Sequence, residues 1–244
     1  MARRLLLLSN STNSGREWLE HAEGPISDFL GSRVSGLLFF PFAAVTFSFD
    51  SYQEKASEVF QRLGYGLSAI HPREHPVVAV KQAGGYVVGG GNTWQLVRYL
   101  YEYDLMEPLR SEIIAGKPYI GWSAGANIAC PTLQTTNDMP IVRPHRFETL
   151  GVIPFQINPH YLDANPEGHQ GETREQRILE FLEVSRDLMV AGLREGSILR
   201  IENDDIRLLG EPAVRIFRYG EQPVECRSGT SMTEMLLPPE KENT

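Results

Sequence analysis

The chain has 244 residues and a mass of 27.4 kDa, enough to bury the core of one large or two small domains. Its formal net charge of −8 and pI near 5.3 argue against the basic surface that nucleic acids or anionic membranes require. The two cysteines, Cys130 and Cys226, are too few for a disulfide framework and lack the spacing of a zinc site. We therefore expect small-molecule partners, no bound metal and a reducing, cytoplasmic location.

The first residues look like the start of a signal peptide, but their apolar run ends too early. Arg3 and Arg4 precede four leucines, and the run stops at Ser9. A signal core needs ~7 to 15 apolar residues. No stretch of the chain reaches the ~18 apolar residues of a membrane span. The leucines are therefore predicted to form a buried first strand.

Short apolar runs alternate with helix-patterned segments through the first two thirds of the chain. The expected strands are residues 5–8, 37–42, 67–70, 86–88 and 119–122, and the expected helices are about 15–31, 50–63, 75–83 and 92–115. Because apolar runs without polar alternation suit strands covered on both faces, the pattern predicts an α/β fold with a doubly wound, mostly parallel sheet. Ligands of such sheets bind at the carboxyl ends of the strands.

Beyond about residue 186 the pattern changes to short alternating runs at 197–201, 206–209 and 214–219. Polar and glycine-containing turns separate them, which predicts antiparallel hairpins that extend or cover the sheet. We expect a single domain over residues 1–237. The charged residues 238–244 are predicted to be a disordered tail.

The sequence Gly121-Trp122-Ser123-Ala124-Gly125 follows an expected strand and precedes a helix-compatible run. Small flanking residues leave room for a serine in the strained turn of a nucleophile elbow. The motif is common by chance, so its position between strand and helix carries the argument. Ser123 is thus a candidate nucleophile at the carboxyl end of a strand.

A second glycine turn, Gly89-Gly90-Gly91, follows the strand at 86–88 and leads into Asn92 and a helix. Glycines let the backbone approach a ligand closely and leave N–H groups free for an oxyanion. A tight turn or an anion-binding loop explains the glycines equally well. A dinucleotide site is disfavoured, because Trp94 occupies the sixth position of the Gly-x-Gly-x-x-Gly register.

A nucleophilic serine needs a general base, for which histidine is the usual residue. Of the six histidines, His160 ends the apolar run at 152–160 and would leave a strand at the same sheet edge as Ser123. His21 falls in an expected helix, and His145 and His169 fall in polar loops. His71 and His75 flank a strand end and a helix start. His160 is therefore the predicted base.

Two carboxylates are candidates for orienting the imidazole. Asp138 lies in a polar loop that could equally be a substrate lid. Glu195 follows the apolar run 189–191, so it would lie at another strand end. Both candidates stay open on the residues alone, although position favours Glu195.

Arg174 lies in the first turn of an amphipathic helix that begins near Thr173. A cation there opposes the helix dipole, which a bound carboxylate would offset. The common alternative is a surface arginine paired with Glu175 or another acid. Arg174 is a candidate for binding an acidic substrate.

Several segments together resemble the peptidase E family of α-aspartyl dipeptidases, in order over nearly the whole chain. They are 5–12, Gly89-Gly90-Gly91-Asn92-Thr93, 120–127, Thr135-Thr136-Asn137-Asp138-Met139-Pro140-Ile141, Gln156-Ile157-Asn158-Pro159-His160, 171–178 and Glu195-Gly196. The resemblance implies a flavodoxin-like fold related to class I glutamine amidotransferases. It also implies a cofactor-free serine peptidase that removes N-terminal aspartate from dipeptides.

Carried over residue by residue, the resemblance implies specific roles. Ser123 would be the nucleophile, His160 the base and Glu195 the orienting acid. Arg174 would hold the substrate's aspartate carboxylate, and Asp138 matches a loop aspartate whose role as lid or site residue stays open. The backbone amides of Gly91 and Ala124 are the expected oxyanion donors, and Asn92 is a further candidate for substrate binding.

Two other functions remain as alternatives. One is a cyanophycinase-like hydrolase of β-linked Asp-Arg, since the family includes cyanophycinases. The other is a non-catalytic, flavodoxin-like module that binds an anion at the Gly89–Asn92 loop. We expect a monomer or a homodimer.

Overall fold

A computed structural model of the chain describes residues 2–164, 168 and 170–237. The strands are β1 (Arg4–Leu8), β2 (Leu37–Phe40), β3 (Leu67–Ala69), β4 (Gly85–Val88), β5 (Tyr119–Trp122), β6 (Gln156–Asn158), β7 (Met189–Leu193), β8 (Ile198–Glu202), β9 (Asp205–Leu209), β10 (Val214–Arg218) and β11 (Val224–Cys226). The helices are α1 (Glu23–Leu30), α2 (Phe49–Arg62), α3 (Pro76–Gln82), α4 (Thr93–Glu102), α5 (Met106–Ile114), α6 (Ala124–Asn127), α7 (Arg174–Val184) and α8 (Thr233–Leu236), with short 3-10 turns at Glu20–Ala22 and Gly31–Arg33. The expected tail, 238–244, lies outside the described residues, and the single-domain boundary at 237 stays a prediction.

The larger sheet has the strand order β3-β2-β4-β5-β1-β8-β9. Its first five strands are mutually parallel, and β8 and β9 extend the β1 edge in antiparallel fashion. This is the predicted α/β, doubly wound, mostly parallel sheet of the flavodoxin-like class. The two antiparallel strands are the predicted runs 197–201 and 206–209.

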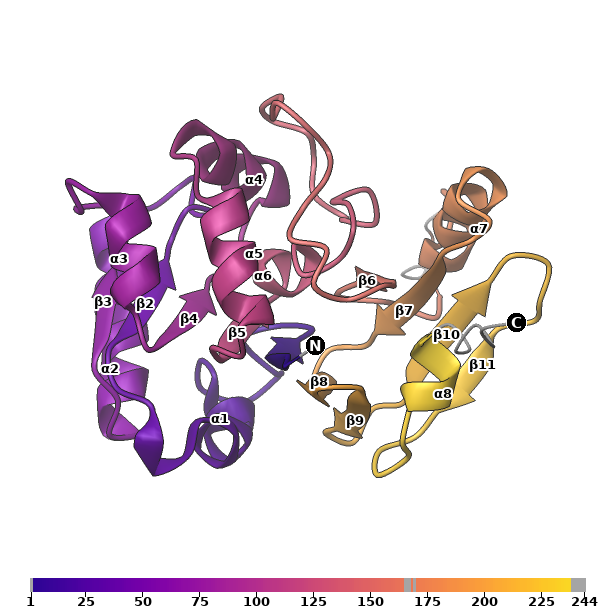
Figure 1. The fold of residues 1–244 in the computed structure, drawn as a ribbon. Coiled ribbons are helices and arrows are strands. Elements are labelled where there is room, and N and C mark those ends of the chain that lie inside the picture. The colour runs from indigo at the N-terminus through magenta and orange to yellow at the C-terminus, as the bar shows by residue number, and fades with distance from the viewer. Residues whose placement is uncertain (1, 165–167, 169, 238–244) are drawn as a thin grey trace, which may run out of the picture.

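Both faces of the parallel strands are buried, which explains their unbroken apolar runs. Along β1, Leu5 and Leu7 pack into one hydrophobic cluster and Leu6 and Leu8 into another, as the twofold alternation of a strand requires. The first cluster contains buried residues of α3, α4, α5 and α6, and the second contains those of α1 and α2. The helices therefore cover opposite faces of the sheet (Figure 1).

The single helix expected at about 92–115 is two helices, α4 and α5. The chain turns between them at Asp104, which has a left-handed φ of 52°. The partly buried Tyr101 and the buried Leu105 and Leu109 are four residues apart, so the apolar spacing continues through the turn and hides the break in the sequence. The helix expected at about 15–31 is likewise shorter, because α1 begins at Glu23.

A second, smaller sheet has the order β11-β10-β7-β6, in which β6 and β7 are parallel. Helix α7 packs on it through a cluster of Ile178 and Leu182 with Val190 and Phe217. Figure 1 shows this sheet and α7 on the far side of β8 from α2 and α3. The run expected at 214–219 thus belongs to the second sheet as β10, and does not extend the first.

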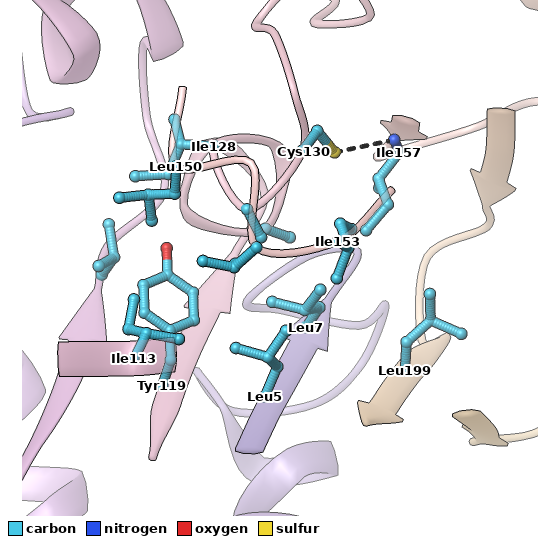
Figure 2. Packing of buried hydrophobic residues seen from close by; sticks show 14 of the residues in the cluster. Leu5, Leu7, Ile113, Tyr119, Ile128, Cys130, Leu150, Ile153, Ile157 and Leu199 are labelled. Atoms are coloured by element: carbon cyan, nitrogen blue, oxygen red, sulfur yellow. Dashed lines mark hydrogen bonds between the residues drawn. The ribbon is translucent and has the colours of Figure 1, made fainter. Parts of the chain in front are cut away.

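The two sheets meet across a shared hydrophobic cluster. Leu7 of β1 and Leu199 of β8 belong to the same cluster as Ile153 and Ile157, which lie just before and within β6 (Figure 2). At this junction the amide of Ile157 donates to the sulfur of Cys130, 3.1 Å away. The position of β6 relative to the first sheet is therefore fixed by apolar packing.

The described residues contain neither a membrane-spanning helix nor a metal-binding cluster. No helix among them has the length and apolar character needed to cross a membrane. No group of three or more histidines, cysteines, aspartates or glutamates among them is arranged to hold a metal ion.

Candidate active site

Ser123 occupies the turn between β5 and α6, with φ of 51° and ψ of −111°. A non-glycine residue with this backbone is strained by about 1–3 kcal/mol, which the surrounding structure must offset. Its amide donates to the carbonyl of Leu8 at 3.0 Å. A Cβ on Gly125 would lie 2.2 Å from the Val88 carbonyl oxygen, and one on Gly121 would lie 2.4 Å from the Gly125 oxygen. Both glycines are thus required for the turn that presents the Ser123 hydroxyl.

His160 and Glu195 come from the second sheet. His160 follows β6 after Pro159, and Glu195 follows β7 after Arg194. The His160 Nε2 lies 3.0 Å from the Ser123 Oγ, and its Nδ1 lies 2.8 Å from the Glu195 Oε1. With a proton on Nδ1, the imidazole donates to the carboxylate and can accept from the serine hydroxyl. The structure therefore brings the three predicted residues together in one chain of hydrogen bonds.

Ser9, the first residue after β1, ties His160 to the main sheet. Its buried hydroxyl accepts from the His160 amide at 2.9 Å and donates to the Leu193 carbonyl, at the end of β7, at 2.8 Å. His160 has a left-handed φ of 53°, so its backbone needs such support. Residues 5–12 are among the segments that resemble the family, but the sequence analysis assigned no role to Ser9. The position of Ser9 at the carboxyl end of a strand was a usable signal.

The glycine loop after β4 lies directly against the serine. A Cβ on Gly90 would be 3.0 Å from the Ser123 Cβ, and one on Gly91, where φ is 137°, would be 2.3 Å from the Ala43 carbonyl oxygen. Among the described residues the amides of Gly91 and Ala124 have no hydrogen-bond partner. Two free donors therefore flank the reactive hydroxyl.

Asn92 has a different place from the one expected. Its Oδ1 accepts from the Gln95 amide at 3.1 Å and caps α4, while its Nδ2 donates to the Met139 carbonyl at 2.9 Å. Neither of the two cavities described below is lined by Asn92. Its side chain orders the start of α4 and the loop at 139, and both of its polar ends are occupied.

Asp138 lines the same cavity as Ser123 and His160, but its side chain is bonded to other residues. Its Oδ2 accepts from the Thr93 amide at 2.8 Å, from the Thr93 hydroxyl at 2.6 Å and from the Thr136 hydroxyl at 3.0 Å. No described hydrogen bond joins Asp138 to His160, and its Oδ1 has no partner among the described residues. Of the two candidate acids, Glu195 is the one that contacts the imidazole.

Arg174 is the first residue of α7, which Thr173 and Gln176 begin with a reciprocal capping box. Burial lowers the pKa of Arg174, the charge of Arg177 lowers it further, and Asp138 raises it. No ion pair of Arg174 is present among the described residues. Glu175, the suggested surface partner, is bonded instead to Arg215 at 3.1 Å. A partly buried guanidinium without a carboxylate is a suitable site for an anion.

Two cavities meet at Asp138. The larger, of about 690 Å³, contains the serine and the histidine and is lined by Ser11, Trp18, Phe47, Ser51, Tyr52, Lys55, Gly90, Gly91, Trp122, Ser123, Asp138 and His160. The smaller, of about 190 Å³, is polar and is lined by Gln134, Thr135, Thr136, Asn137, Asp138, Asn158, Arg174, Arg177, Ile178 and Phe181. The site thus offers a small cationic compartment and a large aromatic one.

The aromatic wall of the larger cavity was missed in the sequence. Tyr52 is buried on α2, donates from its hydroxyl to the Gly90 carbonyl at 3.0 Å and accepts from the Trp122 indole at 2.9 Å. Burial raises the pKa of Tyr52, so the phenol stays neutral. The Trp18 ring packs edge-on against the Trp122 ring, and the two ring centroids are 5.5 Å apart. In sequence Trp18 and Tyr52 look like apolar residues of ordinary helices, and only the fold brings their rings to the cavity that holds Ser123.

Comparison with known proteins places this chain in a known family. The profile of peptidase family S51 matches residues 5–209. Peptidase E of a Nostoc species is 50% identical over 225 residues, 92% of this chain and 93% of that protein. Peptidase E of Salmonella typhimurium is 48% identical over 92% of this chain and 98% of that protein.

Two solved structures share the fold. One from Listeria monocytogenes superposes with a TM-score of 0.64 at 21% identity, over 86% of this chain and 99% of that one. A peptidase from an acI-B1 Actinobacterium superposes with a TM-score of 0.65 at 20% identity, over 95% and 96%. These two likenesses concern the fold. The family match over residues 5–209 and the relatives at about half identity show that the chain belongs to peptidase family S51.

Proposed function

We propose that the chain is a serine dipeptidase that hydrolyses Asp-Xaa dipeptides. The observation that carries the proposal is the unbroken contact from Glu195 through His160 to Ser123, at 2.8 and 3.0 Å, beside two unpaired amides. This is the arrangement that activates a hydroxyl for attack on a carbonyl and stabilises the resulting oxyanion. Membership of a peptidase family makes a peptide bond the substrate.

In the first half of the reaction, the Ser123 Oγ attacks the carbonyl carbon of aspartate while its proton moves to the His160 Nε2. Glu195 stabilises the imidazolium, and the amides of Gly91 and Ala124 donate to the oxyanion. When the tetrahedral intermediate collapses, the carbon–nitrogen bond breaks and His160 gives its proton to the departing amine. The aspartyl group is left as an ester on Ser123.

In the second half, a water molecule attacks the ester with His160 again as the base. The ester bond to the Ser123 oxygen breaks, the serine regains its proton from the imidazolium, and free aspartate leaves. No metal or cofactor takes part in the proposed steps. Each oxyanion donor typically contributes a factor of about 10² to 10³ to the rate.

Specificity for aspartate is assigned to the small cavity. Its volume of about 190 Å³ suits one short side chain, and Arg174 there has no carboxylate partner among the described residues. A guanidinium binds a carboxylate through two parallel hydrogen bonds. The unpartnered Oδ1 of Asp138, at the boundary of both cavities, is placed to accept from the substrate's α-ammonium group.

The test is a substrate panel of Asp-Leu, Glu-Leu, Asn-Leu and β-Asp-Arg, with the parent, Ser123→Ala and Arg174→Met. Asp-Leu is the expected best substrate, and Ser123→Ala is expected to abolish its hydrolysis. Arg174→Met should lower kcat/KM for Asp-Leu about a hundredfold, because each hydrogen bond to a charged group contributes about 1.5–3 kcal/mol. Arg186→Met, at an exposed arginine paired with Glu183, is the matched control and should leave the rate unaltered.

The panel separates the alternatives. Preferential cleavage of β-Asp-Arg would replace the proposal with a cyanophycinase-like activity. A fluorophosphonate that fails to label Ser123 in the folded protein would favour an anion-binding module without catalysis. Equal rates for Arg174→Met and the parent on Asp-Leu would refute the assignment of Arg174.

We also propose a cytoplasmic location. Cys130 and Cys226 are both buried and both free, which fits a reducing compartment.

A further inference from the structure

The larger cavity has a charged residue that the steps above do not use. Lys55 lies on α2, one turn after Tyr52, and among the described lining residues it is the sole lysine or arginine. The other ionisable groups in that described lining are His160, Asp138 and the Tyr52 phenol, which burial keeps neutral. The cavity therefore has its positive charge on the aromatic wall, apart from the serine and its oxyanion donors.

Two contacts hold Lys55 near the catalytic serine. Tyr52 fastens α2 to the glycine loop and to Trp122, and residues three apart on a helix share a face. The Lys55 ammonium lies 4.8 Å from the centroid of the Trp18 ring, which packs edge-on to Trp122. Trp122 immediately precedes Ser123, so this row of rings runs from the ammonium to the reactive residue.

No ion pair of Lys55 is present among the described residues, although acids are close by. The adjoining cavity is lined by Glu17, Glu20, Glu23 and Glu58 together with Lys55 and Arg62. Glu20 is paired with Arg16 and Glu23 with Arg62. A lysine that serves only to balance these acids would be expected to bond to one of them, but its ammonium is over the Trp18 ring instead.

This step rests on the proposed function, in which the substrate supplies a binding partner for the Lys55 ammonium. With the aspartate side chain at Arg174 and its carbonyl at Ser123, the second residue must enter the larger cavity. A peptide extends about 3.3–3.6 Å per residue, so the end of a dipeptide comes one residue beyond the cleaved bond. In a dipeptide that end is a carboxylate, whereas in a longer peptide or a peptide amide it is a neutral amide.

We propose that Lys55 binds the C-terminal α-carboxylate of the substrate and thereby selects dipeptides over longer peptides. The aromatic rings of Trp18, Phe47 and Tyr52 accommodate the second side chain beside it. Lys55 is exposed to solvent, which screens its charge, so the contribution is at the low end for a charged pair, about tenfold in affinity. Because this contact is made before and during the reaction alike, it acts on KM more than on kcat.

The experiment compares Asp-Leu with Asp-Leu amide, which differ only in the terminal charge, and adds Asp-Leu-Leu. The parent should prefer Asp-Leu to its amide by about tenfold in kcat/KM, through a lower KM. In Lys55→Gln this preference should fall to near one, and Lys55→Arg should restore much of it. Lys81→Gln, at an exposed lysine on α3, is the matched control and should keep the parent's preference.

Two results would overturn the inference while leaving the proposed function intact. The parent could cleave Asp-Leu and its amide equally well. The preference for the free acid could also survive in Lys55→Gln; if both rates then fell by the same factor, Lys55 would belong to the general electrostatics of the acidic surface. Failure of the parent to cleave any Asp-Xaa substrate would instead refute the proposed function.

Discussion

The link through Ser9 predicts that one buried hydroxyl, outside the cavity, supports catalysis. In Ser9→Ala both hydrogen bonds of the hydroxyl are lost. The Leu193 carbonyl still accepts from the Tyr161 amide at 2.9 Å, so the His160 amide is the group left unpaired. An unsatisfied buried donor costs about 1–3 kcal/mol.

This cost can appear as a loss of global stability, as a displacement of His160, or as both. If it appears in stability, Tm falls by about 2–4 °C per kcal/mol for a chain of this size. If the imidazole moves away from Ser123, kcat falls by about tenfold for every 1.4 kcal/mol. We expect both, with a loss of five- to a hundredfold in kcat and little change in KM, because the substrate contacts are unaltered.

The assay is steady-state hydrolysis of Asp-Leu together with thermal unfolding. Thr149→Val is the matched control, since the buried Thr149 hydroxyl donates to the Cys130 carbonyl, which also accepts from the Gly151 amide. This variant should lower Tm without a selective loss of kcat. If Ser9→Ala loses stability but keeps the parent's kcat, Ser9 does not position the base and the reasoning fails.

Four further predictions follow, two from the candidate site and two from the buried thiols. Glu195→Gln should lower kcat on Asp-Leu a hundredfold or more with KM nearly constant, because the amide cannot stabilise the imidazolium; a rate within threefold of the parent would contradict this. Asp138→Asn should raise KM for Asp-Leu, and N-acetyl-Asp-Leu should be a poor substrate of the parent; efficient cleavage of the acetylated peptide would remove Asp138 as the ammonium site. Burial raises the pKa of Cys130 and of Cys226, so both thiols should resist a disulfide reagent at pH 8 until the protein unfolds. The same shifts favour folding below the pKa of an unfolded cysteine, about 8.5, and this contribution should be lost as pH rises above it, which denaturant titrations across pH 7 to 10 would measure.

The sheet and the grouping of the candidate site residues could be predicted because they obey local rules. Buried parallel strands appear as unbroken apolar runs, and polar residues just after them meet at one edge. This reasoning marked Ser123, His160 and Glu195 separately, and the structure brings them within hydrogen-bond distance. The break at Asp104 escaped it, because Tyr101 and Leu105 on either side keep a helical spacing of four residues.

Long-range pairing was beyond such rules. Nothing local to β6, β7 and β10 says that they form a sheet of their own, because strand pairing depends on which surfaces pack together. For the same reason Trp18, Tyr52 and Lys55 read as ordinary residues of helical segments. Asn92 is the opposite case: an asparagine just before a helix is a common cap, and that local reading describes its side chain better than substrate binding does.

At the junction of the two sheets, the apolar core also influences the distance between two residues of the candidate site. Ser123 follows a strand of one sheet and His160 a strand of the other, and residues such as Leu7 and Ile153 lie between those sheets (Figure 2). Because protein interiors are close-packed and transmit small displacements, we expect a change of one methylene group between the sheets to alter the 3.0 Å contact between the Ser123 Oγ and the His160 Nε2. In the proposed mechanism that contact carries the proton, so substitutions at this junction are expected to change turnover as well as stability.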